Sequence, residues 1–169
     1  MTIPNAEHLL HQAERLIAPS GPGAPRQTDL RRAISSAYYA VFHSVLAAGA
    51  DEFVGSTRRN EPVYALCYRR VDHRALRDLC TELKKPRLAM RYKNYEAELG
   101  SGARLPGFAV LLVELQEGRY AADYDPAIRL KRSDATIAIG NARIALEHFA
   151  AAPPTSRRLF LALLLFPPR

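Results

Sequence analysis

The sequence predicts an all-α protein: an up-and-down bundle of four to five main helices, followed by a short C-terminal helix. Apolar residues recur at helical spacing in several long stretches, and no stretch alternates with the period of two that a strand needs. Segments rich in Gly and Pro separate these stretches. With 169 residues, the chain is expected to form one domain, residues 1–169. A domain of this length buries about 70% of its unfolded surface.

In the first half of the chain, caps and helix breakers mark three expected helices. Asn5 is a suitable N-cap for the first helix. Thr28 with Asp29 opens the second, which ends before Gly49, a residue type common just after a helix. Pro86 stops the third. The expected elements are a helix over about 6–17, a loop over 18–25, a helix over 28–48, a loop over 50–61, and a helix over about 62–84 that could break near Val71.

The second half contains the remaining helices. The sequence DYDP at 123–126 ends one helix, and Ser133 with Asp134 opens the next. Two proline pairs, at 153–154 and 167–168, bound the last one. The expected elements are an ambiguous segment over 87–99, a loop over 100–107, a helix over 108–122, a helix over about 133–151, and a short helix over 156–166.

Composition points to a soluble, cytoplasmic protein that needs no cofactor. The N-terminus lacks the basic and apolar regions of a signal peptide, and the longest apolar run, Leu159 to Phe166, is far shorter than the ~20 residues that span a bilayer. We therefore expect no membrane association. Cys67 and Cys80 match neither a disulfide framework nor a zinc knuckle, so two free thiols and no metal site are expected.

The positive charge of the chain is confined to one segment. Between Arg58 and Lys93 there are eleven basic and four acidic residues, which equals the +7 of the whole chain. Four tyrosines are interleaved with these charges. Such a segment is typical of a surface that binds RNA or a nucleotide, since cations contact phosphates and rings stack on bases. A solvated face of an Arg-rich protein explains the same pattern, and both interpretations stay open.

A polar stripe runs along the expected helix over 28–48. Arg32, Ser36, Tyr39 and His43 follow one another at spacings of four, three and four, so they share one face. Their donors, hydroxyls and imidazole are suited to holding a phosphate or a ribose. The alternative is that neighbouring helices simply satisfy these groups. The other two faces carry a core stripe and a stripe of small residues, which are Ile34, Tyr38, Val41 and Val45, and Ala33, Ala37, Ala40 and Ser44.

Four segments resemble one known family. LRRAISSAYYAVFHSVLA (30–47) and ELQEGRYAADYDP (114–126) are similar to two motifs of HEPN domains (higher eukaryote and prokaryote nucleotide-binding). CYRRVDHRALRDLC (67–80) and RRLFLALLLF (157–166) resemble a segment and the tail of one bacterial branch. The resemblance implies a helical bundle that is often a homodimer. It also implies nucleotide or RNA binding, and in many members metal-independent ribonuclease activity. Such members often act in toxin–antitoxin or defence systems, so an antitoxin-like protein partner is implied too.

The nuclease motif of that family is an Arg, four to six residues, and a His. Here three residues separate Arg69 from His73 and two separate Arg70 from it, so the chain departs from the motif. RIALEH (143–148) fits formally, but positions five apart on a helix differ by roughly 140° and do not share a face. The match at 143–148 is therefore interpreted as chance.

The candidate residues follow from the stripe and the resemblance together. If RNA is cleaved, His73 or His43 is expected to be the base or the acid, and Arg69, Arg32 or Arg119 the phosphate clamp. The expected catalytic residues are therefore His73, Arg69 and His43. The expected nucleotide- or RNA-binding residues are Arg32, Ser36, Tyr39, Arg70, Arg74, Arg119, Asp123 and Tyr124.

Two alternatives stay open at this point. Arg119 with Asp123, and Tyr120 with Tyr124, have the spacing of an ion pair and a ring pair that only stabilise a helix end. The whole chain is also explained as a non-catalytic protein-interaction module, with the apolar C-terminal run and the small-residue stripe as its contact surfaces.

Overall fold

The computed structural model describes residues 2–18, 23 and 25–168, and within them it is all-helical. The all-α prediction is confirmed. The described residues form eight α-helices, more than the four to five main helices and one short helix predicted, and they contain no strand. The helices are α1 (Ala6–Ile17), α2 (Gln27–Phe53), α3 (Pro62–Arg70), α4 (His73–Leu83), α5 (Glu96–Leu99), α6 (Arg104–Tyr124), α7 (Arg132–Ala151) and α8 (Pro154–Leu165). Short 3₁₀ helices span Ser56–Arg58, Met90–Tyr95 and Ser101–Ala103.

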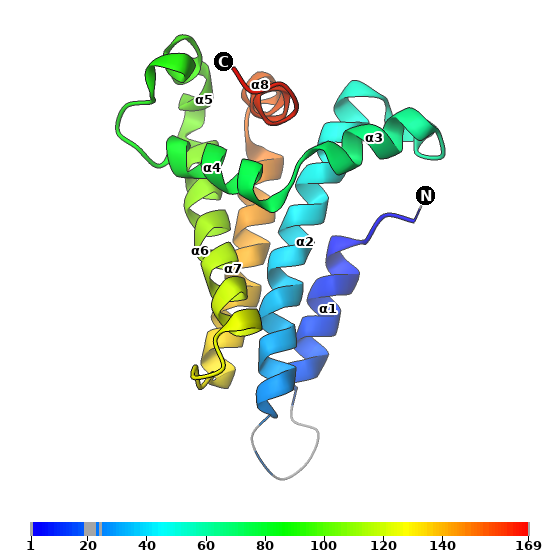
Figure 1. The fold of residues 1–169 in the computed structure, drawn as a ribbon, viewed down its shortest axis with the longest axis vertical. Coiled ribbons are helices and arrows are strands. Elements are labelled where there is room, and N and C mark those ends of the chain that lie inside the picture. The colour runs from blue at the N-terminus through cyan, green and yellow to red at the C-terminus, as the bar shows by residue number, and fades with distance from the viewer. Residues whose placement is uncertain (1, 19–22, 24, 169) are drawn as a thin grey trace.

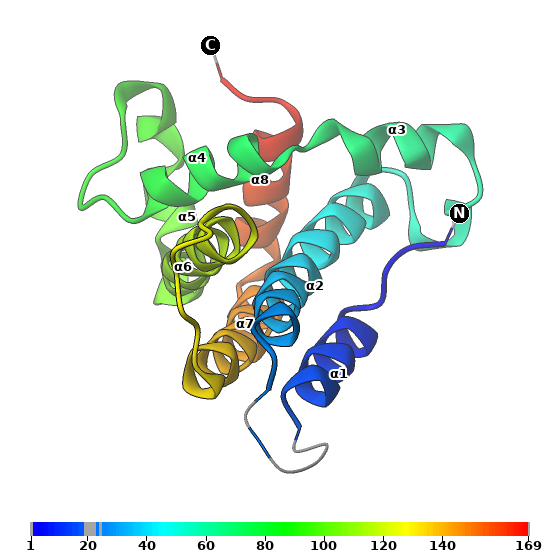
Figure 2. The same cartoon turned by 60° about the horizontal axis from the view of Figure 1, so that its bottom comes forward.

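The long helices α1, α2, α6 and α7 lie side by side (Figure 1). The central helix is α2, which packs against α1, α6 and α7. Helices α3 and α4 cross one end of this group, as both views show (Figures 1 and 2). Helix α4 packs on α6, and α3 packs on α2, so the two crossing helices cover different members of the group.

The small-residue stripe of α2 lies in the core. Ala33, Ala37 and Ala40 are completely buried, which lets neighbouring helices approach the backbone of α2. The helix continues beyond Gly49 to Phe53, so the predicted end of the helix and the start of the loop over 50–61 are wrong. Gly49 sits against Leu161 of α8, and Ala50 is buried, so tertiary packing extends the helix through a residue that usually ends one.

The predicted break near Val71 is confirmed. Val71 is extended and buried, and the side chain of Asp72 caps α4 by accepting a hydrogen bond from the backbone N–H of Ala75 at 2.7 Å. His73 is therefore the first residue of α4. This cap fixes the direction of α4 across the end of α2 and α6.

The predicted loop over 100–107 is wrong in its second half, because α6 begins at Arg104. Gly102 and Ala103 have φ values of +71° and +56° and form the turn before it. Gly107 lies inside α6. A larger residue does not fit there, because a β-carbon would be 2.5 Å from Nδ1 of His148 on α7. The glycine thus permits a close crossing of α6 and α7 and does not mark a loop.

The apolar C-terminal run forms most of α8 and packs on the chain itself, with Phe160, Leu161 and Leu163 through Leu165 all buried. Among the described residues, α2 is the one helix long and apolar enough to span a membrane. The best window of α2 has a mean hydropathy of 1.2, and 67% of that window is buried inside the protein.

Candidate functional site

Two histidines from different helices lie against the same pair of aromatic rings. His43 belongs to α2, and His73 is the first residue of α4. The Phe42 ring centroid is 5.5 Å from that of His43 and 4.0 Å from that of His73. The Tyr39 ring lies 5.9 Å and 5.8 Å from the same two imidazoles. The break before α4 therefore places His73 beside the polar stripe of α2.

A buried tyrosine holds each imidazole through its Nδ1 atom. A hydrogen bond of 2.7 Å joins Tyr38 Oη to His73 Nδ1, and another of 2.7 Å joins Tyr68 Oη to His43 Nδ1. Both tyrosines are buried, whereas both histidines are half-buried. The Nε2 atoms have no hydrogen-bond partner in the described part of the chain, so they are the atoms that remain for an incoming group.

Burial and neighbouring charge keep both imidazoles neutral near pH 7. Burial lowers the pKa of His43, and the nearby His73 lowers it further. Burial also lowers the pKa of His73, Arg119 adds to this, and Asp72 opposes it. Burial raises the pKa of the Tyr38 and Tyr68 hydroxyls, which stay protonated. The cluster thus offers imidazoles that can accept a proton.

Arg119 of α6 brings a fixed positive charge to the same cluster. Its Nη2 donates to Tyr39 Oη at 2.9 Å, and its Nε lies 2.8 Å from Asp123 Oδ2. The Nε–H is buried and is not aimed at an acceptor, so this contact is an ion pair without a well-directed hydrogen bond. The guanidinium also lies between the rings of Tyr39 and Tyr124, 5.5 and 5.4 Å from their centroids. The side chain is 15% exposed, so it is held in place and still accessible.

The predicted site residues fall into two groups. His43, His73, Tyr39, Arg119, Asp123 and Tyr124 come together as described above.

The other predicted residues lie outside these contacts. Arg32, Arg69 and Arg70 are exposed and Ser36 is half-buried, and none of the four makes a side-chain hydrogen bond or ion pair within the described chain. Arg74 is exposed and pairs loosely with Asp78 at 3.6 Å. These side chains are available to a ligand without being organised by the protein.

Sequence reasoning missed Tyr38, Tyr68 and Ser35. Tyr38 belongs to the core stripe by its spacing, and it is indeed completely buried, but its hydroxyl reaches His73. Ser35 donates to Asp123 and so ties α2 to the end of α6. Tyr64 and Tyr68 are four residues apart, so both lie on one face of a helix. This spacing is the signal in the sequence that α3 directs two hydroxyls to α2.

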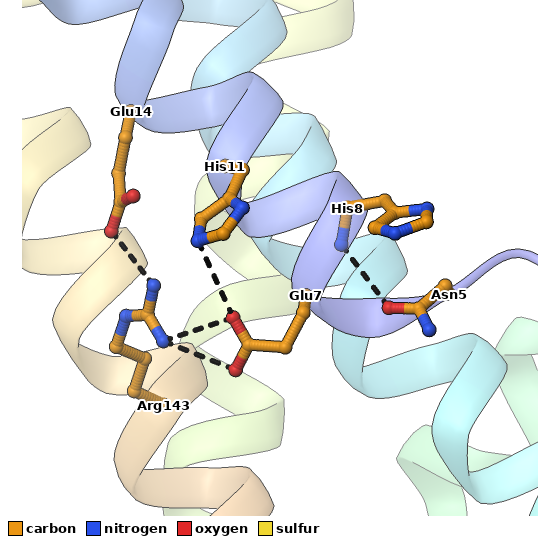
Figure 3. A network of polar contacts seen from close by, with 6 residues as sticks. All are labelled: Asn5, Glu7, His8, His11, Glu14 and Arg143. Atoms are coloured by element: carbon orange, nitrogen blue, oxygen red, sulfur yellow. Dashed lines mark hydrogen bonds and ion pairs between the residues drawn. The ribbon is translucent and has the colours of Figure 1, made fainter.

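RIALEH (143–148) contributes to a different part of the molecule. Arg143 bridges α7 to α1, with Nη1 3.2 Å from Glu7 Oε1 and Nη2 2.8 Å from Glu14 Oε1 (Figure 3). His11 lies 4.0 Å from Glu7 in the same network (Figure 3). His148 packs against Gly107 of α6. The arginine and the histidine thus have separate partners, in agreement with the interpretation of this match as chance.

The basic segment is partly neutralised by carboxylates of the chain. Arg58, Arg59 and Arg77 pair with Glu61, Asp51 and Glu117 at 2.6, 2.6 and 3.0 Å. Lys85 pairs with Glu82 at 2.6 Å. Within the described chain, the residues of this segment without an ion pair or ring contact are Arg69, Arg70, Lys84, Arg87 and Lys93.

Two cavities lie near α6. One of about 200 Å³ adjoins Arg119 and is lined by α4 and α6. A larger one of about 500 Å³ is mostly apolar and lies between α6 and α7, away from the imidazoles. No group of three or more His, Cys, Asp or Glu side chains suited to a metal ion occurs among the described residues.

Comparison with protein-family models, with curated proteins and with solved structures finds no match to this chain.

Proposed function

We propose that this chain binds RNA or a nucleotide at the cluster of His43, His73 and Arg119, and that it cleaves RNA without a metal ion. The observation that carries this proposal is the convergence of two imidazoles and one guanidinium on a single side chain, Tyr39. Cleavage of a phosphodiester bond needs a base, an acid and a positive charge beside the phosphate, and these three side chains supply them.

In the proposed reaction, Nε2 of His73 accepts the proton of a ribose 2′-hydroxyl as its oxygen attacks the adjacent phosphorus. His73 is assigned this role because burial lowers its pKa and Arg119 lowers it further, which leaves the imidazole neutral and able to accept a proton. His43 acts as the acid in the molecules in which both of its ring nitrogens carry a proton. It gives the Nε2 proton to the 5′ oxygen as the bond between that oxygen and phosphorus breaks, and it becomes neutral. Arg119 faces the charge that develops on the phosphoryl oxygens. The products are a 2′,3′-cyclic phosphate and a 5′-hydroxyl.

The resemblance of the two main motifs to HEPN domains supports this proposal, because those motifs supply Tyr39, His43, Arg119 and Asp123. On the same basis we propose that α1, α2, α6 and α7 form an up-and-down bundle that acts as a homodimer in the cytoplasm. An antitoxin-like protein partner, in a toxin–antitoxin or defence system, belongs to the same proposal. Arg69, Arg70, Arg74 and Arg32 would then contact the RNA backbone around the imidazoles.

One observation favours the second candidate, a non-catalytic protein-interaction module. Arg119 already contacts Asp123 and Tyr39, and four other basic residues pair closely with carboxylates of the chain. If these pairs persist in solution, the positive charge serves the stability of the fold rather than RNA binding. The two candidates differ in one measurable property, which is RNA cleavage.

The test is incubation of the purified protein with a labelled RNA in the presence of EDTA. The proposal predicts cleavage in EDTA, loss of cleavage in His43→Ala and in His73→Ala, and a cyclic phosphate at the new 3′ end. Arg119→Ala and Arg143→Ala form a matched pair, since both remove an arginine that pairs with carboxylates. Only Arg119→Ala is expected to abolish cleavage.

The result that would overturn the enzymatic proposal is a wild-type protein that cleaves no RNA in EDTA, or cleavage that survives in both histidine variants. RNA binding without cleavage would keep the cluster as a binding site only. The absence of both binding and cleavage would favour the protein-interaction module.

A further inference from the structure

A small cavity adjoins the proposed site and shares Arg119 with it. Arg77 of α4 lines one side, and Gln116, Glu117, Arg119 and Tyr120 of α6 line the other. Its volume is about 200 Å³. Pockets for drug-sized molecules measure roughly 300–1,000 Å³, so this cavity has room for a single planar ring system.

The side chains of the cavity are suited to a nucleobase. Tyr120 is 65% exposed, and its ring centroid lies 5.0 Å from that of Tyr124, which is also exposed. Exposed rings provide a stacking surface that accepts any base. Arg77 and Glu117, paired at 3.0 Å, add donors and an acceptor of the kind that contact base edges.

Two buried polar atoms of the lining residues lack a hydrogen-bond partner in the described chain. Gln116 donates through Nε2 to the backbone oxygen of His73 at 3.1 Å, but its Oε1 accepts nothing. Arg119 Nε is the second such atom. Arg119 Nε already lies 2.8 Å from Asp123 Oδ2, so Gln116 Oε1 is the atom of the two that is left to accept a hydrogen bond from an incoming base. Gln116 also ties the wall of the cavity to the first residue of α4, next to the imidazoles.

We infer that this cavity holds one nucleobase, stacked on Tyr120, whose nucleotide places its phosphate at Arg119. The inference rests on the proposed function, because it assigns the base that adjoins the phosphate bound there. A base in an RNA strand and the base of a free nucleotide offer the same chemistry. Tyr120, Arg77 and Gln116 thus become binding residues beside those of the imidazole cluster.

The test uses a short RNA that carries the fluorescent base 2-aminopurine, whose emission is quenched on stacking. The proteins compared are the wild type, Tyr120→Ala, Tyr120→Phe and, as a control, Phe166→Ala, which removes an exposed ring at the end of α8. Because Tyr120 is exposed, its truncation leaves the core intact, which circular dichroism checks. Total RNA binding is measured in parallel by anisotropy of an end-labelled strand.

We expect Tyr120→Ala to lose the quenching and to weaken binding roughly fivefold or more, the value of one stacked base. Tyr120→Phe and Phe166→Ala keep both signals. Adenosine monophosphate is then added as a competitor. If the emission of 2-aminopurine returns, a free nucleotide is the occupant; if the emission does not change, the occupant is a base within a strand. Unchanged quenching in Tyr120→Ala, with RNA still bound, overturns this cavity assignment and leaves the proposed function standing. No RNA binding by the wild type overturns both.

Discussion

Tyr64 and Tyr68 lie one turn apart on α3, and both direct their hydroxyls to α2. Tyr64 Oη donates to Asp51 Oδ1 at 2.8 Å, whereas Tyr68 Oη bonds to His43 Nδ1 at 2.7 Å. Tyr68→Phe leaves that Nδ1 without a partner, so we expect cleavage of RNA to slow about fivefold, as a lost hydrogen bond of about 1 kcal/mol implies. Tyr64→Phe is the matched control and should lower only the free energy of unfolding. Cleavage rates and urea unfolding of both variants check this, and equal cleavage by Tyr64→Phe and Tyr68→Phe would contradict it.

The two imidazoles also make stability depend on pH. Burial lowers the pKa of both His43 and His73, so the unfolded chain binds protons at these positions more readily than the folded one. Their stabilisation is therefore fully present above the unfolded pKa of about 6.5 and is lost as the pH falls through it towards the folded values. Urea unfolding at pH 7.5 and pH 5.5 should show a lower free energy at pH 5.5.

Replacement variants separate this effect from other groups. His43→Gln and His73→Gln should each reduce the loss of stability between the two pH values, whereas His8→Gln, on the exposed face of α1, should not. The carboxyls whose pKa is lowered, such as those of Asp51 and Glu82, contribute only near and below pH 4. If the drop in unfolding free energy between pH 7.5 and pH 5.5 is the same in all three histidine variants, the imidazoles of His43 and His73 are not its cause.

At the scale of helices, the crossing of α6 and α7 depends on one glycine. A β-carbon at Gly107 would lie 2.5 Å from His148 Nδ1, while one at Gly140 of α7 would meet nothing within 4 Å. We expect Gly107→Ala to destabilise the fold by about 1–3 kcal/mol through overpacking. Gly140→Ala should be neutral or stabilising by up to about 1 kcal/mol, because alanine favours a helix. Thermal unfolding of both variants decides this; equal melting temperatures would contradict the close crossing.

Most helices could be predicted from the sequence because their signals are local. Asn5, the predicted cap of the first helix, accepts a backbone hydrogen bond from His8. The predicted break near Val71 is followed by Asp72, which accepts one from Ala75. Two predicted loops failed: one began where Gly49 was interpreted as a helix end, and the other was the Gly-rich segment over 100–107. Gly107 is instead a site of close helix packing against α7, and Gly49 lies in a stretch of α2 that α8 covers. That information lies in the partner helices, which are distant in sequence.

The candidate site was partly predictable for the same reason. Tyr39 and His43 share a face of α2 by spacing alone. Arg119 and His73 came from the motifs, and no local signal placed them beside that face. Tyr38 could not be recognised as a partner of His73, because burial explains its position equally well and the contact joins residues 35 apart.

For the whole molecule, charge should control the binding of RNA. In a plot of the logarithm of the binding constant against the logarithm of the salt concentration, each phosphate contacted on a single strand adds about −0.7 to the slope. Arg69 and Arg70 have no ion pair within the described chain, whereas Arg58 and Arg59 pair with carboxylates. We expect Arg69→Ala/Arg70→Ala to reduce the slope by about 1.4, and Arg58→Ala/Arg59→Ala to change it much less. Anisotropy titrations between about 50 and 200 mM salt check this. Equal slopes for the two double variants would contradict it.

The central claim is that His43 and His73 act together in one site, and a double-mutant cycle on RNA cleavage tests it most directly. The cleavage rate is measured in EDTA for the wild type, His43→Ala, His73→Ala and the variant that carries both changes. Residues that act as a unit are non-additive, so the double variant should cleave no more slowly than either single variant. Losses that multiply in the double variant, or a single variant that keeps the full rate, would contradict a shared site.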